Sequence, residues 1–163
     1  MKLRIRKSTN ADTRSARGKV TKEQLERDSL QHISDVRQAL DWMARQLRII
    51  GGMHDWSKIQ HIDDFYVDFQ SIQEGFQGDF KQMHWYKDLH LQERHHLNDK
   101  CPEDVNLFDV LERIADGVMA GLARSGDVYE EELDVEILAR AYKNTQSLLK
   151  ANVEVLDGTA DTE

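Results

Sequence analysis

The chain has 163 residues, of which 39% are hydrophobic and 32% are charged, and its formal net charge is −8. These proportions are typical of a soluble helical protein with one sizeable core, and they exclude a wholly disordered chain. No apolar stretch approaches the roughly 20 residues of a membrane span. The single cysteine excludes an intramolecular disulfide, and the N-terminus lacks the apolar segment of a secretory signal. We therefore expect a cytoplasmic protein that contacts no membrane.

Positive charge is concentrated at the N-terminus. Residues 1–22 carry eight Lys or Arg side chains and one acidic side chain, so the remaining residues carry a net charge of −15. Residues 1–20 are therefore expected to form a basic, flexible arm that is solvated, folds onto its own domain or makes weak contact with nucleic acid. Residues 156–163 are expected to be a frayed acidic tail, and residues 21–155 a single helical domain.

The first predicted helix begins after a capping box. Thr21 and Gln24 have the spacing at which each side chain can bond the backbone of the other. Apolar residues then recur every three or four positions up to Ile50, which predicts an amphipathic helix. Gly51 and Gly52 are expected to end it.

Four further helical segments follow. Residues 57–72 predict a short helix and residues 79–97 a third one, after which a loop holds the only proline. Asn106 is the expected N-cap of a fourth helix over residues 107–126, which is apolar nearly all round and is therefore expected to be buried centrally. A fifth helix is predicted over residues 130–152. Since no segment alternates like a strand, the predicted fold class is all-α, with about five helices.

Two carboxylates interrupt the apolar surface of the predicted fourth helix. Glu112 and Asp116 are four residues apart and therefore share a face. A buried carboxylate without a partner costs several kcal/mol or becomes protonated. Each is therefore expected to meet a cation, which is either Arg113 in an ion pair or a metal ion.

Histidines are the second group of candidate ligands. His32 is expected to face the interior from the apolar stripe of the first helix, where a lone histidine is more often a core residue than a ligand. His54 and Asp55 follow the end of that helix, and Lys58 comes three residues later. Four more histidines fall within thirteen residues: His84, His90, His95 and His96. Imidazole suits Mn, Fe, Co, Ni and Zn, so this clustering indicates a transition-metal site.

The candidates follow one another along the chain as His32, His54-Asp55, His90, His95-His96 and Asp116. This order resembles the HD-domain superfamily of metal-dependent phosphohydrolases, whose signature is His … His-Asp … Asp on a helical bundle. The stretches HDWSK and LERIADGVMAGLARSG resemble the family's His-Asp pair and its final aspartate helix. The resemblance covers roughly residues 25–126 and is strongest to small HD-like proteins of phages and bacteria. No Gly-Tyr-Pro motif follows His95-His96, which sets the chain apart from the cyclic-di-GMP branch.

The resemblance implies an HD-domain-like bundle that holds one or two divalent ions of Mn, Fe, Co, Ni or Zn. In the two-metal form Asp55 bridges the ions; the other ligands are His32, His54 and Asp116 for the first ion and His90, His95 and His96 for the second. A one-metal site of His32, His54, Asp55 and Asp116 stays open, as does the choice between His84 and His90. On a straight helix His90 and His95 would diverge by about 140°. We therefore expect the predicted third helix to break near Glu93.

The resemblance also implies hydrolysis of a phosphate ester, by preference of a nucleotide, by metal-activated water. Asp55, Lys58 and Arg94 are then the catalytic candidates. Lys58 and Arg94 are expected to contact the phosphate. Glu112 is expected either to hold a histidine ligand or to pair with Arg113.

A different class of function also fits the sequence. The chain could be a non-catalytic helical interaction protein, encoded by a phage and located in the host cytoplasm, whose basic arm binds nucleic acid or a host protein. Under either hypothesis the chain could form a homo-oligomer. There is no P-loop, dinucleotide fingerprint or Cys-x-x-Cys pair, so the sequence gives no support for a kinase, a dehydrogenase or a structural zinc site.

Overall fold

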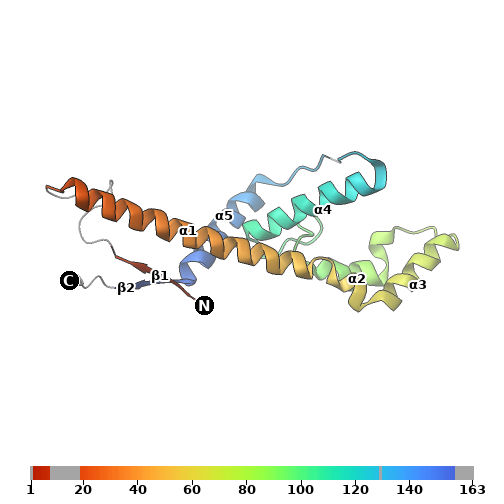
Figure 1. Ribbon diagram of the computed structural model, residues 1–163. Coiled ribbons are helices and arrows are strands. Elements are labelled where there is room, and N and C mark those ends of the chain that lie inside the picture. The colour runs from red at the N-terminus through yellow and green to blue at the C-terminus, as the bar shows by residue number, and fades with distance from the viewer. Residues whose placement is uncertain (1, 8–18, 129, 157–163) are drawn as a thin grey trace. The chain divides into compact units, whose positions relative to one another are not determined.

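The computed structural model describes residues 2–7, 19–128 and 130–156 (Figure 1). Its fold is all-α, which confirms the predicted class. The described residues contain five α-helices: α1 (Lys22–Met53), α2 (Trp56–Gln60), α3 (Ile62–Gln73), α4 (Leu107–Ser125) and α5 (Val135–Ala151). None of these helices combines the length and the apolar character needed to cross a membrane.

The chain divides into two compact units, whereas the sequence predicted a single domain over residues 21–155. The terminal unit consists of the residues up to Gln46 together with those from Gln146 onward, and the central unit is Leu47–Thr145. Every candidate site residue except His32 belongs to the central unit.

Two short strands belong to the terminal unit, although the sequence predicted none. β1 (Leu3–Arg6) pairs in parallel with β2 (Val153–Leu156), with Leu3 opposite Val153 (Figure 1). Arg4 and Glu154 add an ion pair of 3.0 Å between the strands. The alternation of apolar and charged residues covers only four positions in each strand, which is too short to stand out in the sequence. The predicted flexible arm therefore contains a strand, while residues 8–18 of it and 157–163 of the predicted tail lie outside the described residues.

The start of α1 confirms the predicted capping box. The Thr21 N–H donates to Gln24 Oε1 at 3.0 Å, and the Gln24 N–H donates to Thr21 Oγ1 at 3.2 Å. The end of α1 differs from the prediction, because the helix runs through Gly51 and Gly52 to Met53. An interior helical glycine costs only about 1 kcal/mol relative to alanine, which a helix of 32 residues can absorb.

Replacing Gly52 by alanine is expected to raise the free energy of unfolding by about 0.5–1 kcal/mol, because alanine is the better helix former. A Cβ at this position would have no atom within 4 Å. Urea denaturation followed by circular dichroism measures the change. Gly126→Ala is the control: Gly126 ends α4 with φ 74°, so the same substitution there should lower stability. A destabilised Gly52→Ala variant would contradict the helical assignment.

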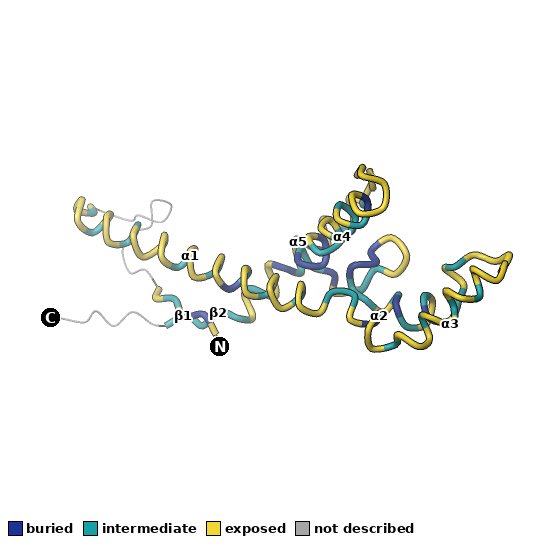
Figure 2. Tube along the Cα trace, turned by 45° about the vertical axis from the view of Figure 1, so that its right-hand side comes forward, coloured by how far each residue is buried: buried dark blue, intermediate teal, exposed yellow. Residues whose placement is uncertain are grey.

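The core of the central unit lies between α4, α5 and the loop before α4. Its buried members are Leu97, Val105, Val110 and Ala141. Asn106 caps α4 as predicted, accepting from the Phe108 N–H at 2.9 Å. The prediction that α4 is buried centrally is wrong, because four of its apolar side chains are 46–66% exposed, namely Leu111, Ile114, Met119 and Leu122. Figure 2 shows α4 coloured as exposed or intermediate along much of its length. Only one side of α4 packs on the core.

The predicted third helix over residues 79–97 is wrong, because the segment between α3 and α4 has only short helical turns joined by irregular backbone. This segment contains the 3₁₀ turn η1 (Phe80–Gln82), the π-helical turn η2 (Trp85–Leu89) and the 3₁₀ turn η3 (His90–Gln92). Glu93 is extended, with φ −64° and ψ 133°. This confirms the predicted break near Glu93. The predicted helix over residues 57–72 is also divided, into α2 and α3, at His61.

Candidate metal centre

The left-handed backbone conformation of Asp55 positions the side chains of His54 and Asp55. His54 and Asp55 lie between α1 and α2, and Asp55 has φ 53° and ψ 23°, the only positive φ outside glycine among the described residues. Aspartate tolerates this conformation better than most residues because its short side chain can bond locally. The turn starts α2 in a new direction, with the Lys58 N–H donating to the Asp55 carbonyl at 2.9 Å. The Lys58 ammonium then pairs with Asp55 Oδ2.

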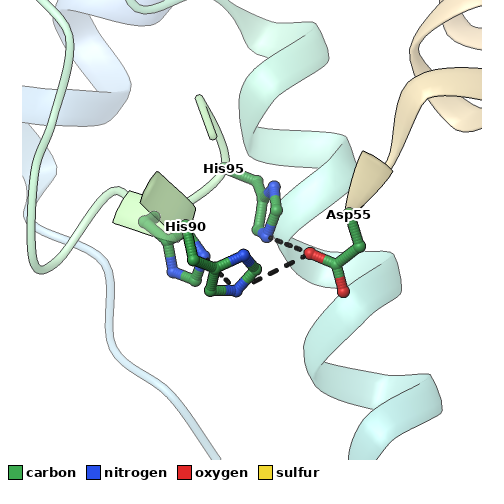
Figure 3. Close-up of side chains that lie close together, drawn as sticks. Asp55, His90 and His95 are labelled. Atoms are coloured by element: carbon green, nitrogen blue, oxygen red, sulfur yellow. Dashed lines mark hydrogen bonds and ion pairs between the residues drawn. The ribbon is translucent and has the colours of Figure 1, made fainter. Parts of the chain in front are cut away.

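The break at Glu93 brings three histidines together. His90 lies in η3, whereas His95 and His96 follow the break, and their exposed fractions are 4%, 1% and 7%. His90 Nε2 and His95 Nε2 lie 3.8 and 3.5 Å from the same atom, Asp55 Oδ1 (Figure 3). The Nε2 atoms of His90 and His96 are 2.9 Å apart. We call Asp55, His90, His95 and His96 the histidine group; each offers one ligand atom, and all four atoms lie within 4.8 Å of one another.

A second group of possible ligands faces the other oxygen of Asp55. His54 Nε2 lies 3.5 Å from Asp55 Oδ2 and 3.7 Å from Asp116 Oδ1, which α4 contributes. We call His54, Asp55 and Asp116 the carboxylate group; its ligand atoms meet the same 4.8 Å limit. Asp55 therefore belongs to both groups, with one carboxylate oxygen directed at each.

Neighbouring side chains fix the orientation of the imidazole rings. His54 Nδ1 is 3.0 Å from Glu112 Oε1, and His90 Nδ1 is 3.0 Å from Ser57 Oγ. With Nδ1 as the donor, the Nε2 lone pair of each ring points toward Asp55 and is available to a metal ion. The Trp85 ring stacks on His90 with centroids 4.6 Å apart, which holds that ring from its face.

Glu112 also contacts His95, since its Oε1 lies 3.3 Å from His95 Nδ1. Of the two roles expected for Glu112, the structure shows the contact with histidines. Arg113 pairs instead with Asp116, at 3.2 Å, and with Glu131. With His54 and His95, Glu112 forms a third set of atoms able to surround an ion.

Burial and charge set the protonation of the group. Burial lowers the pKa of His90 to about 4, and burial together with the neighbouring His95 lowers that of His96 to about 4. Both rings are therefore neutral at pH 7, as a metal ligand must be. Burial opposes ionisation of Asp55, but the hydrogen bond and charge of Lys58 outweigh it and lower the pKa of that carboxyl group. Burial disfavours protonation of His95, yet the contact with Glu112 raises its pKa.

Two buried atoms at the middle of the histidine group support a bound cation. Asp55 Oδ1 and His95 Nε2 are both inaccessible to solvent and make no hydrogen bond. Buried polar atoms without partners cost about 1–3 kcal/mol each, and more when charged. A divalent ion between them would satisfy both, and the set of imidazoles and carboxylates suits transition metals. The residues present therefore fit a metal ion.

His32 lies outside the unit that holds this centre. The side chain is exposed, so the prediction that it faces the interior is wrong, and it belongs to none of the ligand groups. It lies on α1, 22 positions before His54 in the chain. His84 is also exposed and pairs with Asp88 at 2.9 Å, so of His84 and His90 only His90 belongs to a group of possible ligands.

Arg94 has a structural position instead of the predicted phosphate contact. Its guanidinium donates twice to the Asp109 carboxylate, at 2.8 Å each, once to the Asp104 carboxylate at 2.8 Å and once to the Asp104 carbonyl at 3.2 Å. Asp109 is 2% exposed and accepts from the Asn106 N–H at the start of α4. Arg94 therefore stabilises the N-terminus of α4.

Arg94→Met is expected to lower the free energy of unfolding by about 2 kcal/mol, because it leaves the buried Asp109 carboxylate without its cation. This is less than the 3–5 kcal/mol typical of a fully buried pair, since the Arg94 side chain is 41% exposed. Urea denaturation measures the loss, and bound metal should be unchanged. Arg48→Met, an exposed position on α1, is the matched control. Unchanged stability would contradict the structural role.

The chain matches no protein-family model, no curated protein and no solved structure. The resemblance to the HD superfamily therefore depends on the order of residues in the sequence, and the metal centre depends on geometry alone.

Proposed function

We propose that the protein is a metal-dependent phosphohydrolase whose centre holds two divalent ions of the series Mn, Fe, Co, Ni and Zn. The observation that carries this proposal is the position of Asp55. Its Oδ1 faces His90 and His95, and its Oδ2 faces His54. A carboxylate shared in this way is the usual bridge of a two-metal site.

The residues divide into three roles. The histidine group would hold one ion and the carboxylate group the other, with Asp55 common to both. When bound, such ions act as Lewis acids toward phosphoryl oxygens and make water more acidic. Ser57 Oγ and Glu112 Oε1 contact Nδ1 of His90 and His54, and where Nδ1 is the donor, Nε2 of the same ring would be left to bind an ion.

Lys58 has the third role, which is to contact the phosphate of the substrate. Its ammonium sits on Asp55 Oδ2, and its side chain is 35% exposed, so it can also meet a ligand from solvent. Near a phosphate it would donate a charge-assisted hydrogen bond to a phosphoryl oxygen. In the reaction, a water oxygen bonds to phosphorus, the bond from phosphorus to the ester oxygen breaks, and the departing oxygen gains the proton that water loses.

The resemblance to the HD superfamily favours a nucleotide substrate. Of the aromatic residues that could stack on a base, Trp85 is buried between Phe65 and His90 and is therefore occupied. Tyr86 is half-buried, with its hydroxyl donating to Asp99 at 3.3 Å, and Trp56 is 49% exposed.

A hydrolysis screen tests the proposal. Protein expressed with added Mn²⁺ is incubated with nucleotides and simple phosphate esters, and phosphate release is measured. Asp55→Asn serves as the inactive variant and Asp64→Asn, at an exposed position on α3, as its control. We expect release by the wild type and by Asp64→Asn only. A protein that binds metal but cleaves nothing would favour the non-catalytic interaction protein.

A further inference from the structure

A pocket of about 270 Å³ opens beside the candidate metal centre. Four residues of the centre form part of its wall: Asp55, His90, His96 and Asp116. The rest of the wall includes four cations: Lys58, Lys81, Arg113 and Arg124. A ligand held at the metal centre can therefore continue into a space lined by basic side chains.

The protein groups of this pocket balance one another in charge. Its four cations face four carboxylates, from Asp55, Asp99, Asp116 and Glu131. Lys81 pairs with Asp99 at 2.9 Å, and Arg113 pairs with Asp116 at 3.2 Å. Since the lining is neutral in sum, each divalent ion at the centre would leave the pocket with an excess of two positive charges. The pocket then favours a ligand with several negative charges.

Arg124 is the cation best placed to meet such a ligand. Residues 113, 117, 120 and 124 lie on one side of α4, on successive turns. Gly117 and Ala120 are small and leave the space between the two arginines open. The two arginines are about 16 Å apart along the helix axis. Arg113 is engaged by carboxylates, whereas Arg124 forms no ion pair with any described residue.

We propose that this pocket binds a linear oligophosphate, so that the substrate is an ester of diphosphate or triphosphate, and that Arg124 determines this specificity. The proposal rests on the proposed hydrolase function. The volume of about 270 Å³ equals the share of about nine water molecules. That space suits a short phosphate chain but not an additional nucleoside. The guanidinium of Arg124 can bind two phosphate oxygens at once, at the end of the pocket away from the ions.

The test measures binding to the full-length, Mn²⁺-loaded protein by calorimetry, with inorganic tripolyphosphate and inorganic phosphate as probes. The wild type should bind tripolyphosphate at least about tenfold more tightly than phosphate. Arg124→Met should remove most of this difference while phosphate binding changes less than about twofold, and Arg124→Lys should restore part of it. Ala120→Leu, which narrows the pocket, should also weaken the binding of tripolyphosphate more than the binding of phosphate. Arg48→Met is the control and should behave like the wild type.

Free tripolyphosphate also binds metal ions, so variants are compared at equal probe concentration and bound Mn²⁺ is measured after each titration. Equal affinity for both probes in a protein that still hydrolyses simple esters would overturn the oligophosphate inference and leave the proposed function standing. Equal tripolyphosphate affinity in Arg124→Met and the wild type would overturn the role of Arg124. A protein without bound metal or hydrolysis would overturn both proposals.

Discussion

Replacing Asp55 by asparagine is expected to remove nearly all bound metal, with affinity lowered more than about 100-fold, because Asp55 is the one residue common to both ligand groups. Hydrolysis should fall with it. Asparagine tolerates the left-handed backbone of this position, so the protein should remain folded. Metal analysis of purified protein, together with circular dichroism, measures both effects.

Asp64→Asn provides the matched control, since it removes an exposed carboxylate on α3 that belongs to none of the ligand groups. Its metal content should equal that of the wild type. If Asp55→Asn kept a full complement of metal, neither the bridging role nor the two-metal centre could be maintained.

His95→Gln is expected to halve the metal content and to lower hydrolysis by at least about 100-fold. His95 belongs to the histidine group but not to the carboxylate group, so one ion should be lost and the other retained. Glutamine keeps most of the volume of this fully buried side chain, which limits the loss of stability. Inductively coupled plasma analysis gives the number of ions per chain.

His84→Gln is the control for the same change at an exposed histidine, and it should leave metal content and rate unchanged. Two other results for His95→Gln are informative. Unchanged metal with a lower rate would mean that His95 contacts the phosphate and that a single ion is bound elsewhere. Loss of all metal would mean that both groups hold one shared ion.

The sequence predicted the starts of α1 and α4 correctly, because the capping residues and the backbone groups that they bond lie within one helical turn. The bonds between Thr21 and Gln24, and the cap at Asn106, involve residues within three positions of each other. The two glycines near the end of α1 misled the prediction, because a glycine permits a helix end without requiring one. The strands could not be predicted, since β1 and β2 pair residues 150 positions apart.

At the candidate site, too, local features were predicted from the sequence, whereas contacts between distant residues were not. The break near Glu93 followed from helix geometry, and it explains how His90 and the His95-His96 pair meet. The error at His32 arose because an apolar stripe shows which face could be covered, not whether another element covers it. Ser57 was not predicted as the partner of His90, because a hydroxyl 33 positions away carries no signal in a single sequence. Arg94 was assigned to phosphate by its neighbours in the chain, while its side chain reaches Asp109.

The most direct test of the two-metal centre is the electron paramagnetic resonance spectrum of protein fully loaded with Mn²⁺. A carboxylate shared by two ions couples their spins, so we predict the spectrum of an exchange-coupled pair at about two ions per chain. In Asp55→Asn this spectrum should be absent. A wild-type spectrum of isolated Mn²⁺ at full loading would contradict an Asp55 bridge between two ions.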